Sequence, residues 1–260
     1  MNIRRLQGFM LRHLYPLRRD FDLLSDMVYW PLVDTLLWGI TSQWFIETSG
    51  IPELVTATLS ALILWNVIWR AQAEISRNLI DEIWNNNLVN LFSTPFNVKE
   101  WIVGVLTLSV FKTALTVSIL TPVILALYSV NVLSFGWWLI VFFLLTGMTG
   151  WWVGFISAGI VLRYGPKVQT VVWTLPGALL PFSAVYFPLD QLPNWIRPIS
   201  MIVPTTYVFE SMRSLLLQNT IDPKMLAISF MLNCLYLGLA ITYFVASFRK
   251  SRELGLGRFN

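Results

Sequence analysis

Few side chains in this sequence have both the type and the surroundings that chemistry requires. Three ionisable residues, Asp34, Arg70 and Lys112, stand inside long apolar stretches, where a charge is costly unless it is paired or faces water. The chain holds one histidine, His13, and one cysteine, Cys234. A single cysteine excludes a disulfide framework and a cysteine-based zinc site, and a single histidine argues against a histidine-rich metal centre.

The depth of the three charges decides which of them can pair. Asp34 lies roughly 10 Å in from one end of its apolar stretch at 1.5 Å per residue, and Arg70 lies at a similar depth on a stretch that runs the other way. An Asp34–Arg70 ion pair is therefore allowed, either for helix packing or along a transport path, although Arg70 could equally pair with Glu74 one turn further on. Lys112 has no obvious acid at its depth, so it either snorkels or faces a wet cavity.

Motifs for independent catalysis or ATP binding are missing from the sequence. The chain has no Gly-Lys dipeptide and therefore no G-x-x-x-x-G-K-[ST] loop of its own. HExxH, CxxC and GxSxG are absent too, and Ser-His-Asp catalysis would have to use the lone His13. We expect no catalytic residue, no metal site and no cofactor on this chain, and any energy for work must come from elsewhere.

The composition identifies the solvent as a lipid bilayer. Of 260 residues, 56% are hydrophobic and only 12% are charged, and the mean hydropathy is +0.64, whereas about a quarter of the residues of an average soluble protein are charged. A β-barrel needs alternating segments, but runs such as WWLIVFFLL are continuously apolar. The fold class expected is an all-α membrane protein, with residues 1–260 as a single transmembrane domain.

Stretches of the roughly 20 apolar residues that a helix needs to cross a bilayer predict six spans. They cover residues 27–46, 54–75, 101–128, 135–162, 169–187 and 225–248. The third and fourth are overlong, so they should tilt or project beyond the lipid. In the fourth, Gly150 and Gly154 have the GxxxG spacing that lets helix backbones approach closely, more often within a chain than in a dimer.

Residues 1–26 precede the first span and predict an amphipathic helix in the headgroup layer, over residues 3–19. Apolar residues recur there at helical spacing, with five arginines between them, and this stripe argues against a disordered basic tail. The apolar residues are Ile3, Leu6, Met10, Leu14 and Leu17, and the arginines are Arg4, Arg5, Arg12, Arg18 and Arg19.

Lysine and arginine positions predict the orientation in the membrane. Thirteen of them fall in the N-terminal segment, the link at 76–100, the turn at 163–168 and the C-terminal tail. The other connections hold three in 188–224 and none in 47–53 or 129–134. We therefore expect a multi-pass protein of the cell membrane with both termini in the cytoplasm.

The link at 76–100 carries a short amphipathic helix that ends at Ser93-Thr94-Pro95. Its apolar face consists of Ile83, Trp84, Leu88, Leu91 and Phe92. A new helix should start near Asn97, with Asn97 as N-cap and Glu100 at the third position. An amphipathic helix ended by proline suits docking into a groove on a cytoplasmic partner; the alternative is a helix that merely lies on the membrane.

The segment 179–217 is rich in proline, interleaved with apolar and aromatic side chains. Prolines break helices, and a broken helix at membrane depth survives only where protein or water covers its backbone. We therefore expect short half-helices over 188–217 that dip back from the outer surface between the fifth and sixth spans. Such re-entrant elements commonly cap or gate a pathway.

Two of these segments resemble a known family. The sequence FSAVYFPLDQLPNWIRPISMIVPTTYVFESMR closely resembles the signature after the fifth span in membrane subunits of type-2 ABC exporters, and the start of the chain is similar to their drug and lipooligosaccharide branch. The link at 82–104 also resembles the family's coupling region, except for three asparagines at 85–87. The residues on the outer pattern are Pro188, Leu189, Leu192, Pro193, Trp195, Pro204, Thr206, Tyr207 and Arg213.

The resemblance implies a permease subunit that is not itself an enzyme. Two permeases, identical or different, and two copies of an ATP-binding cassette ATPase would form the working unit in membrane lipid, with ATP and Mg²⁺ on the ATPase and no nucleic acid as partner. The coupling helix would consist of Glu82, Trp84, Leu88, Leu91, Phe92, Thr94 and Pro95. The outer gate would consist of Pro188, Leu192, Pro193, Trp195, Pro204, Tyr207 and Arg213.

The expected function is export of a lipophilic or amphipathic substrate out of the cytoplasm or the inner leaflet. Abundant aromatic residues and few buried charges suit such a substrate. Export of a lipid-linked glycan is the alternative within transport, and a non-transporting membrane scaffold for a cytoplasmic partner is the alternative from another class. A passive channel is disfavoured because no charged or carbonyl-rich filter is visible.

Overall fold

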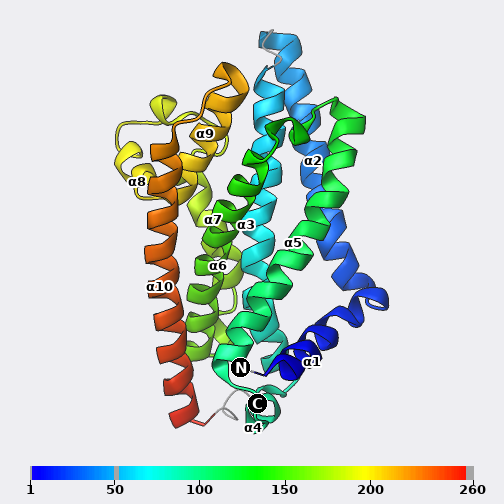
Figure 1. Ribbon diagram of the computed structural model, residues 1–260, viewed down its shortest axis with the longest axis vertical. Coiled ribbons are helices and arrows are strands. Elements are labelled where there is room, and N and C mark those ends of the chain that lie inside the picture. Colours follow the sequence, from blue (N-terminus) through cyan, green and yellow to red (C-terminus); the bar gives the residue numbers. More distant parts are fainter. Residues whose placement is uncertain (1, 50–52, 256–260) are drawn as a thin grey trace.

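The structure, a computed structural model, describes residues 2–49 and 53–255. This part of the chain is helical and contains no strand. Long helices run side by side along one axis, and most of the short helices lie near the two ends (Figure 1). The middle of the predicted loop 47–53 and the end of the basic tail lie outside the described residues.

The long helices form the body of the molecule and the short ones form its connections. The long helices are α2 (Phe21–Ser49), α3 (Glu53–Trp84), α5 (Val98–Tyr128), α6 (Trp138–Tyr164) and α10 (Pro223–Glu253). The shorter α-helices are α1 (Ile3–Leu14), α4 (Leu88–Ser93), α7 (Val171–Leu179), α8 (Arg197–Met201) and α9 (Pro204–Gln218). The 3₁₀ turns are η1 (Pro16–Arg18), η2 (Val132–Phe135), η3 (Pro166–Val168), η4 (Leu180–Phe182) and η5 (Leu189–Gln191).

Among the described residues, three helices are long and apolar enough to cross a membrane: α5, α6 and α10. Helices α5 and α10 contain the predicted spans 101–128 and 225–248, and α6 contains all of the predicted span 135–162 except its first three residues. The predicted spans 27–46 and 54–75 lie within α2 and α3, which are similarly long but are not among these three on the strength of their described residues. The chain is therefore a helical protein with the features of a membrane protein.

The predicted span 169–187 is not one continuous helix. The α-helix there, α7, has only nine residues, about 13 Å at 1.5 Å per residue, and it passes into the turn η4. Prolines explain the interruption, because Pro176 lies inside α7 and Pro181 inside η4, and neither can donate a backbone hydrogen bond. The backbone then turns at Ala184, which has a positive φ of 53°.

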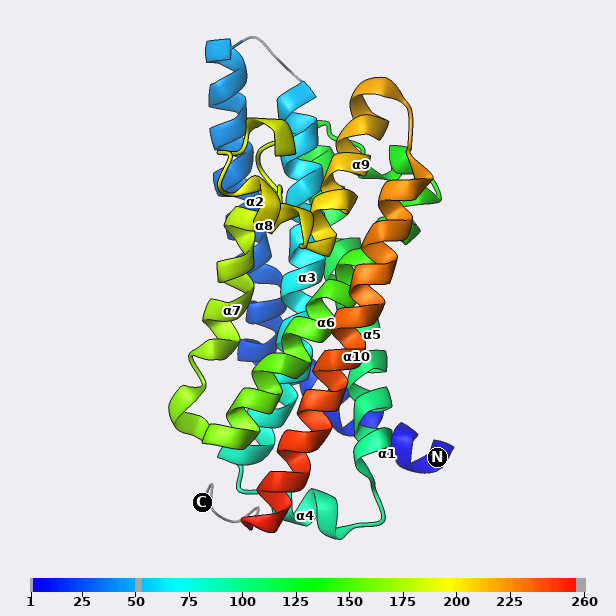
Figure 2. The same cartoon turned by 90° about the vertical axis from the view of Figure 1, so that its left-hand side faces the viewer.

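Helix α6 occupies the centre of the bundle and packs against α3 and α10 (Figure 2). Two glycines allow the close approach to α3. A Cβ on Gly150 would lie 2.5 Å from the backbone oxygen of Ile68, and one on Gly154 would lie 3.0 Å from that of Gln72. The GxxxG pair therefore serves packing within the chain.

Helix α1 is amphipathic, as predicted, but shorter. It ends at Leu14 because Pro16 follows and cannot continue its hydrogen bonds. The sequence interpretation missed Phe9, which is the buried side chain of this helix, whereas Ile3 of the predicted apolar stripe is exposed. A Cβ on Gly104 of α5 would lie 2.5 Å from the Phe9 ring, so this glycine makes room for the contact.

The predicted start of α5 is confirmed. Asn97 caps the helix, its side chain accepts from the Glu100 backbone at 2.9 Å, and the Glu100 carboxylate accepts from the Asn97 backbone at 3.1 Å. The same carboxylate accepts from the backbone nitrogen of Asn2 and lies 3.7 Å from the Arg5 guanidinium. Glu100 thereby ties the beginning of α1 to the beginning of α5. Helices α1 and α4 and the end of α10 lie at one end of the molecule, and α8 and α9 lie at the other (Figure 1).

Candidate functional site

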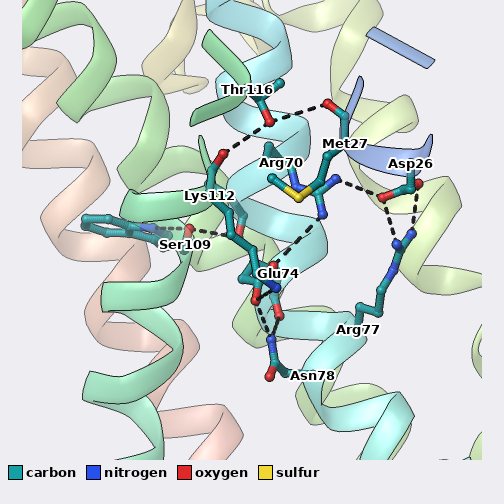
Figure 3. A network of polar contacts seen from close by, with 11 residues as sticks. Asp26, Met27, Arg70, Glu74, Arg77, Asn78, Ser109, Lys112 and Thr116 are labelled. Carbon is teal, nitrogen blue, oxygen red and sulfur yellow. Dashed lines mark hydrogen bonds and ion pairs between the residues drawn. The ribbon is translucent and has the colours of Figure 1, made fainter. Parts of the chain in front are cut away.

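A network of buried charges joins α2, α3 and α5 (Figure 3). Asp26 of α2 accepts from Arg70 Nη1 at 2.8 Å and from both Nη atoms of Arg77 at 2.7 and 3.1 Å. Two guanidinium groups of α3 therefore converge on one carboxylate of α2. Charge-assisted bonds of this kind are roughly twice as strong as neutral ones and fix the geometry of the groups that they join.

The α5 part of the network is an ion pair between Lys112 and Glu74. Lys112 Nζ lies 2.7 Å from Glu74 Oε1, and both side chains are almost fully buried. Glu74 also accepts from Asn78 Nδ2 at 2.7 Å and lies 3.9 Å from Arg70. A buried charge of this kind persists only when it is paired and hydrogen-bonded, and each member of the network supplies a partner for another.

The structure corrects two sequence expectations about these charges. Arg70 pairs with Asp26 and Glu74, so the Asp34–Arg70 pair is wrong, and the alternative Arg70–Glu74 contact is present. Lys112 does have an acid at its depth, Glu74, so it does not snorkel. No described residue forms a hydrogen bond or ion pair with Asp34.

A polar cavity of about 540 Å³ lies on the side of the network toward α1 and α4. Its lining includes the whole α3 part of the network, Lys112 and several charged groups of α1 and the end of α3. The charged and titratable lining residues are Arg12, His13, Asp20, Arg70, Glu74, Arg77, Asp81, Glu82 and Lys112. The cavity therefore offers room for water next to Lys112. Such room is what the second sequence alternative, a Lys112 that faces a wet cavity, requires.

Two groups of the polar cavity, both outside the predicted spans, have shifted pKa values. Burial lowers the pKa of His13 to about 4, so its imidazole is neutral at pH 7. Burial raises the pKa of Asp81 to about 6, against a smaller opposite effect of Arg77. Desolvation disfavours the charged form of each group, so the protonation of this cavity changes between pH 4 and pH 6.

An aromatic cavity of about 470 Å³ lies on the other side of the network. Aromatic side chains from α2, α3, α7 and the segment after η4 line it, together with a few polar groups. The aromatic residues are Trp30, Trp38, Trp65, Trp69, Trp173 and Tyr186, and the polar ones are Asp26, Asp34, Asn66, Arg70 and Thr116. A cavity of this size, mostly apolar with a few polar groups, is typical of a small-molecule site.

Arg70 and Trp173 line both cavities, so these two side chains form part of the wall between them. The Arg77 guanidinium carbon lies 5.3 Å from the centroid of the Trp173 ring, within the range of a cation–π contact. Gln72 Nε2 donates to the backbone oxygen of Val172 at 2.9 Å and holds α7 against α3. The wall between the cavities is therefore built from α3 and α7, with Asp26 of α2 bound to its arginines.

The residues predicted for the coupling helix divide into a buried and an exposed group. Glu82 is buried and pairs with Arg12 at 2.7 Å, Leu88 is buried in the core, and Leu91 and Phe92 are half-buried against that core. Trp84, Thr94 and Pro95 are exposed, as is Val89, which the sequence interpretation did not select. The expected docking face therefore packs largely inside the chain.

The three asparagines at 85–87 form the turn between α3 and α4. Asn86 has a positive φ of 51°, and asparagine tolerates this left-handed region better than most residues. The backbone nitrogen of Asn87 donates to the backbone oxygen of Glu82 at 2.9 Å, and its side chain donates to the Glu82 carboxylate at 2.6 Å. These asparagines thus have a structural reason to stand between the two helices.

The outer segment 188–217 contains three short helical elements with prolines at their junctions: η5, α8 and all of α9 except its last residue. Several residues of the predicted gate stabilise this arrangement from within. The buried Arg213 donates to the backbone oxygen of Ala184 at 2.7 Å and to Glu210 at 2.8 Å. Tyr207 donates to the backbone oxygen of Met201 at 2.7 Å.

The remaining gate residues differ in exposure. Leu192 and Pro204 are buried, and Pro188 is half-buried. Pro193 and Trp195 are exposed at the outer end. Some residues of the predicted gate therefore stabilise the outer segment from inside, and others lie on its surface.

Sequence reasoning missed Asp26, Glu74 and Arg77 as members of one site. A signal was present, because residues 70, 74 and 77 are spaced i, i+4 and i+7 and so share one face of a helix. Asp26 stands just before the predicted span 27–46 and was left outside it. Within the described residues, no group of three or more His, Cys, Asp or Glu side chains is placed to hold a metal ion.

Comparison with protein-family models gives no match to this chain, and no curated protein matches it.

Proposed function

We propose that the chain is the membrane subunit of a type-2 ABC exporter, which moves a lipophilic or amphipathic substrate out of the cytoplasm or the inner leaflet. The outer segment carries the sequence resemblance to that family. The structural observation that supports it best is the pair of cavities that share Arg70 and Trp173. One cavity is lined by charged groups and the other by aromatic groups. Together they provide successive binding places for the polar and the apolar parts of an amphipathic molecule.

In this proposal the chain crosses the cell membrane six times, with both termini in the cytoplasm. The position of α1, α4 and the end of α10 at one end of the bundle agrees with that orientation (Figure 1). The fifth crossing is made by α7 and η4, and α8 and α9 are the outer half-helices between the fifth and sixth crossings. Broken helix there is supported because its backbone is held by protein, as Arg213 and Tyr207 illustrate.

An ATP-binding cassette ATPase docks at α4, and two permeases and two ATPases form the working unit, with ATP and Mg²⁺ on the ATPase. The exposed side chains Trp84 and Val89 provide the docking surface. Leu88, Leu91 and Phe92 anchor α4 to the core, and the Phe92 and Phe248 rings pack 4.6 Å apart. A force on α4 is thereby passed to α3 and α10.

Substrate passage requires the wall between the two cavities to open. Closure of the ATPase moves α3 relative to α2 and separates Asp26 from Arg70 and Arg77. The two arginines released in this step line the polar cavity, where water solvates them and limits the cost, and Asp26 lines the aromatic cavity. The aromatic cavity then holds the apolar part of the substrate before its release past the outer segment.

Export of a lipid-linked glycan is the second candidate, because the aromatic cavity supplies faces on which sugar rings can stack. A membrane scaffold that only recruits a cytoplasmic partner would use α4 without the cavities. The scaffold and the exporter would both bind the partner, so only a measurement of transport distinguishes them.

Purification in mild detergent from the native host, followed by mass spectrometry and an ATPase assay, tests the proposal. An ATP-binding subunit in stoichiometric amount is expected, and Val89→Asp or Trp84→Ala should remove it because both side chains are exposed on the docking surface. Leu133→Asp, an exposed position on η2 in the connection between α5 and α6, is the matched control and should keep the subunit. A folded chain that purifies alone, with no nucleotide-dependent activity in any fraction, would contradict the proposal.

A further inference from the structure

We propose that the aromatic cavity binds an amphipathic organic cation, whose positive charge is met by Asp34 and whose apolar groups stack on the surrounding tryptophans. The inference adds a substrate class to the proposed function. The role of this binding in export rests on that proposed function. The sequence interpretation allowed Asp34 either an ion pair with Arg70 or a place along a transport path, but it did not identify this cavity or a ligand.

The walls of the cavity are held in place by packing from several elements. The Trp38 and Tyr186 rings stack with their centroids 4.5 Å apart, which joins α2 to the segment after η4. Trp65 of α3 is buried, and Trp173 of α7 is held near Arg77. Aromatic faces carry negative electrostatic potential, so a cavity built from them is prepared for a cation.

The charge of the cavity lining also favours a cation. Asp26, Asp34 and Arg70 are its charged members. Asp26 is occupied by Arg70 and Arg77, and Arg70 is in turn shared with Glu74. Asp34 is exposed and has no hydrogen-bond or ion-pair partner among the described residues, so its carboxylate is available to bind the positive charge of a ligand.

A carboxylate without a direct partner at this depth is costly in a membrane, and such groups usually mark substrate or ion pathways. A bound organic cation supplies a partner for Asp34 without the hydration shell that a metal ion would bring. Cation–π contacts contribute about 0.5–2 kcal/mol each, most when desolvated. The volume of about 470 Å³ falls within the range of cavities that hold drug-sized ligands.

The same features disfavour an anion. Arg70, the cation in the lining, is only 4% exposed, and its guanidinium contacts two carboxylates. An anionic headgroup would displace one of these carboxylates and would also approach Asp34. Trp30 lines the cavity and is 60% exposed, so part of the cavity lining is open to a ligand at the surface.

Equilibrium dialysis of the purified full chain in zwitterionic nanodiscs tests this inference, with binding measured over empty nanodiscs. The probes are tetraphenylphosphonium and tetraphenylborate, which have nearly the same shape and opposite charge. We expect tetraphenylphosphonium to bind more tightly. Asp34→Asn should weaken its binding at least tenfold, Asp34→Glu should retain most of it, and Trp30→Leu should weaken it less than Asp34→Asn does.

Asp190→Asn, at an exposed carboxylate of the outer segment, is the control and should leave binding unchanged. Tighter binding of tetraphenylborate, or equal binding of tetraphenylphosphonium to the wild type and to folded Asp34→Asn, would overturn the inference. Displacement of the probe by a neutral oligosaccharide that binds Asp34→Asn as well as wild type would overturn it in favour of a glycan site. The assay contains no ATPase, so its outcome is independent of whether an ATP-binding subunit is found.

Discussion

The Arg70 guanidinium of α3 donates to the Asp26 carboxylate of α2 at 2.8 Å. Arg70 is one of the side chains between the polar cavity and the aromatic cavity. Arg77 adds a bidentate contact to the same carboxylate. Asp26 therefore binds α2 to the wall between the cavities. Substitutions at this contact and at its neighbours should alter both the stability and the function of the protein.

Asp26→Ala should destabilise the protein strongly. The change leaves Arg70 with Glu74 alone, at 3.9 Å, and removes the only carboxylate bonded to Arg77 in the described part of the chain. Removing one partner of a buried ion pair costs about 3 kcal/mol or more. Thermal unfolding in detergent, followed by tryptophan fluorescence, measures the loss, and Asp190→Ala is the surface control. Equal stability of the two variants would show that the Asp26 contacts contribute nothing.

Lys112→Met should lower the stability more than the double variant Lys112→Met/Glu74→Gln. The single change leaves the buried Glu74 without its closest cation, whereas the double change removes both charges. Pairs of this kind are often replaced by neutral groups at little cost, while loss of one partner costs about 3–5 kcal/mol. A double-mutant cycle on the unfolding temperature gives the coupling between the two residues. Additive effects would argue against the ion pair.

Gly150→Val should destabilise the bundle, because its Cβ would lie 2.5 Å from the backbone oxygen of Ile68, which cannot move without shifting α3. Overpacking of this kind costs about 1–3 kcal/mol or more. Gly147→Ala in the same helix is the control, since its Cβ meets only the Val67 side chain at 4.0 Å. An unchanged oligomeric state with a lowered unfolding temperature is expected for Gly150→Val. Loss of a dimer with unchanged stability would instead indicate that this glycine faces a second copy.

The sequence was sufficient to predict the helical class, the amphipathic start and the Asn97 cap, because each depends on local pattern. The apolar runs of α5, α6 and α10 were equally clear. The sequence did not predict which residue of α2 pairs with Arg70, since the choice between Asp26 and Asp34 depends on how α2 is rotated against α3. It also failed for Leu88, because an amphipathic face looks the same whether it binds a partner or its own core.

Asp81→Asn should raise the stability at pH 7.5 and have much less effect near pH 4. The pKa of Asp81 is raised from 3.8 to about 6 in the folded protein, so the folded state binds the proton more tightly than the unfolded one. Above pH 6 both states are ionised and the folded state carries the cost of a desolvated carboxylate. After allowance for the partial exposure of this group, the gain on neutralisation is about 1–2 kcal/mol.

Unfolding temperatures of wild type and Asp81→Asn between pH 4 and pH 8 measure this dependence. His13 contributes in the opposite direction, because its pKa is lowered from 6.5 to about 4 and stability is lost as the pH falls through that window. The comparison is therefore made in the His13→Gln background as well. A difference between the paired variants that does not change with pH would contradict the raised pKa of Asp81.

The central claim is that this chain exports an amphipathic molecule with energy from a partner ATPase. Inside-out vesicles that contain the chain and its co-purified ATPase test it most directly, through uptake of tetraphenylphosphonium and of neutral amphiphiles. We predict uptake that requires ATP hydrolysis and is lost in Val89→Asp while the chain remains folded. Equal uptake with ATP, with a non-hydrolysable analogue and without nucleotide would contradict the account.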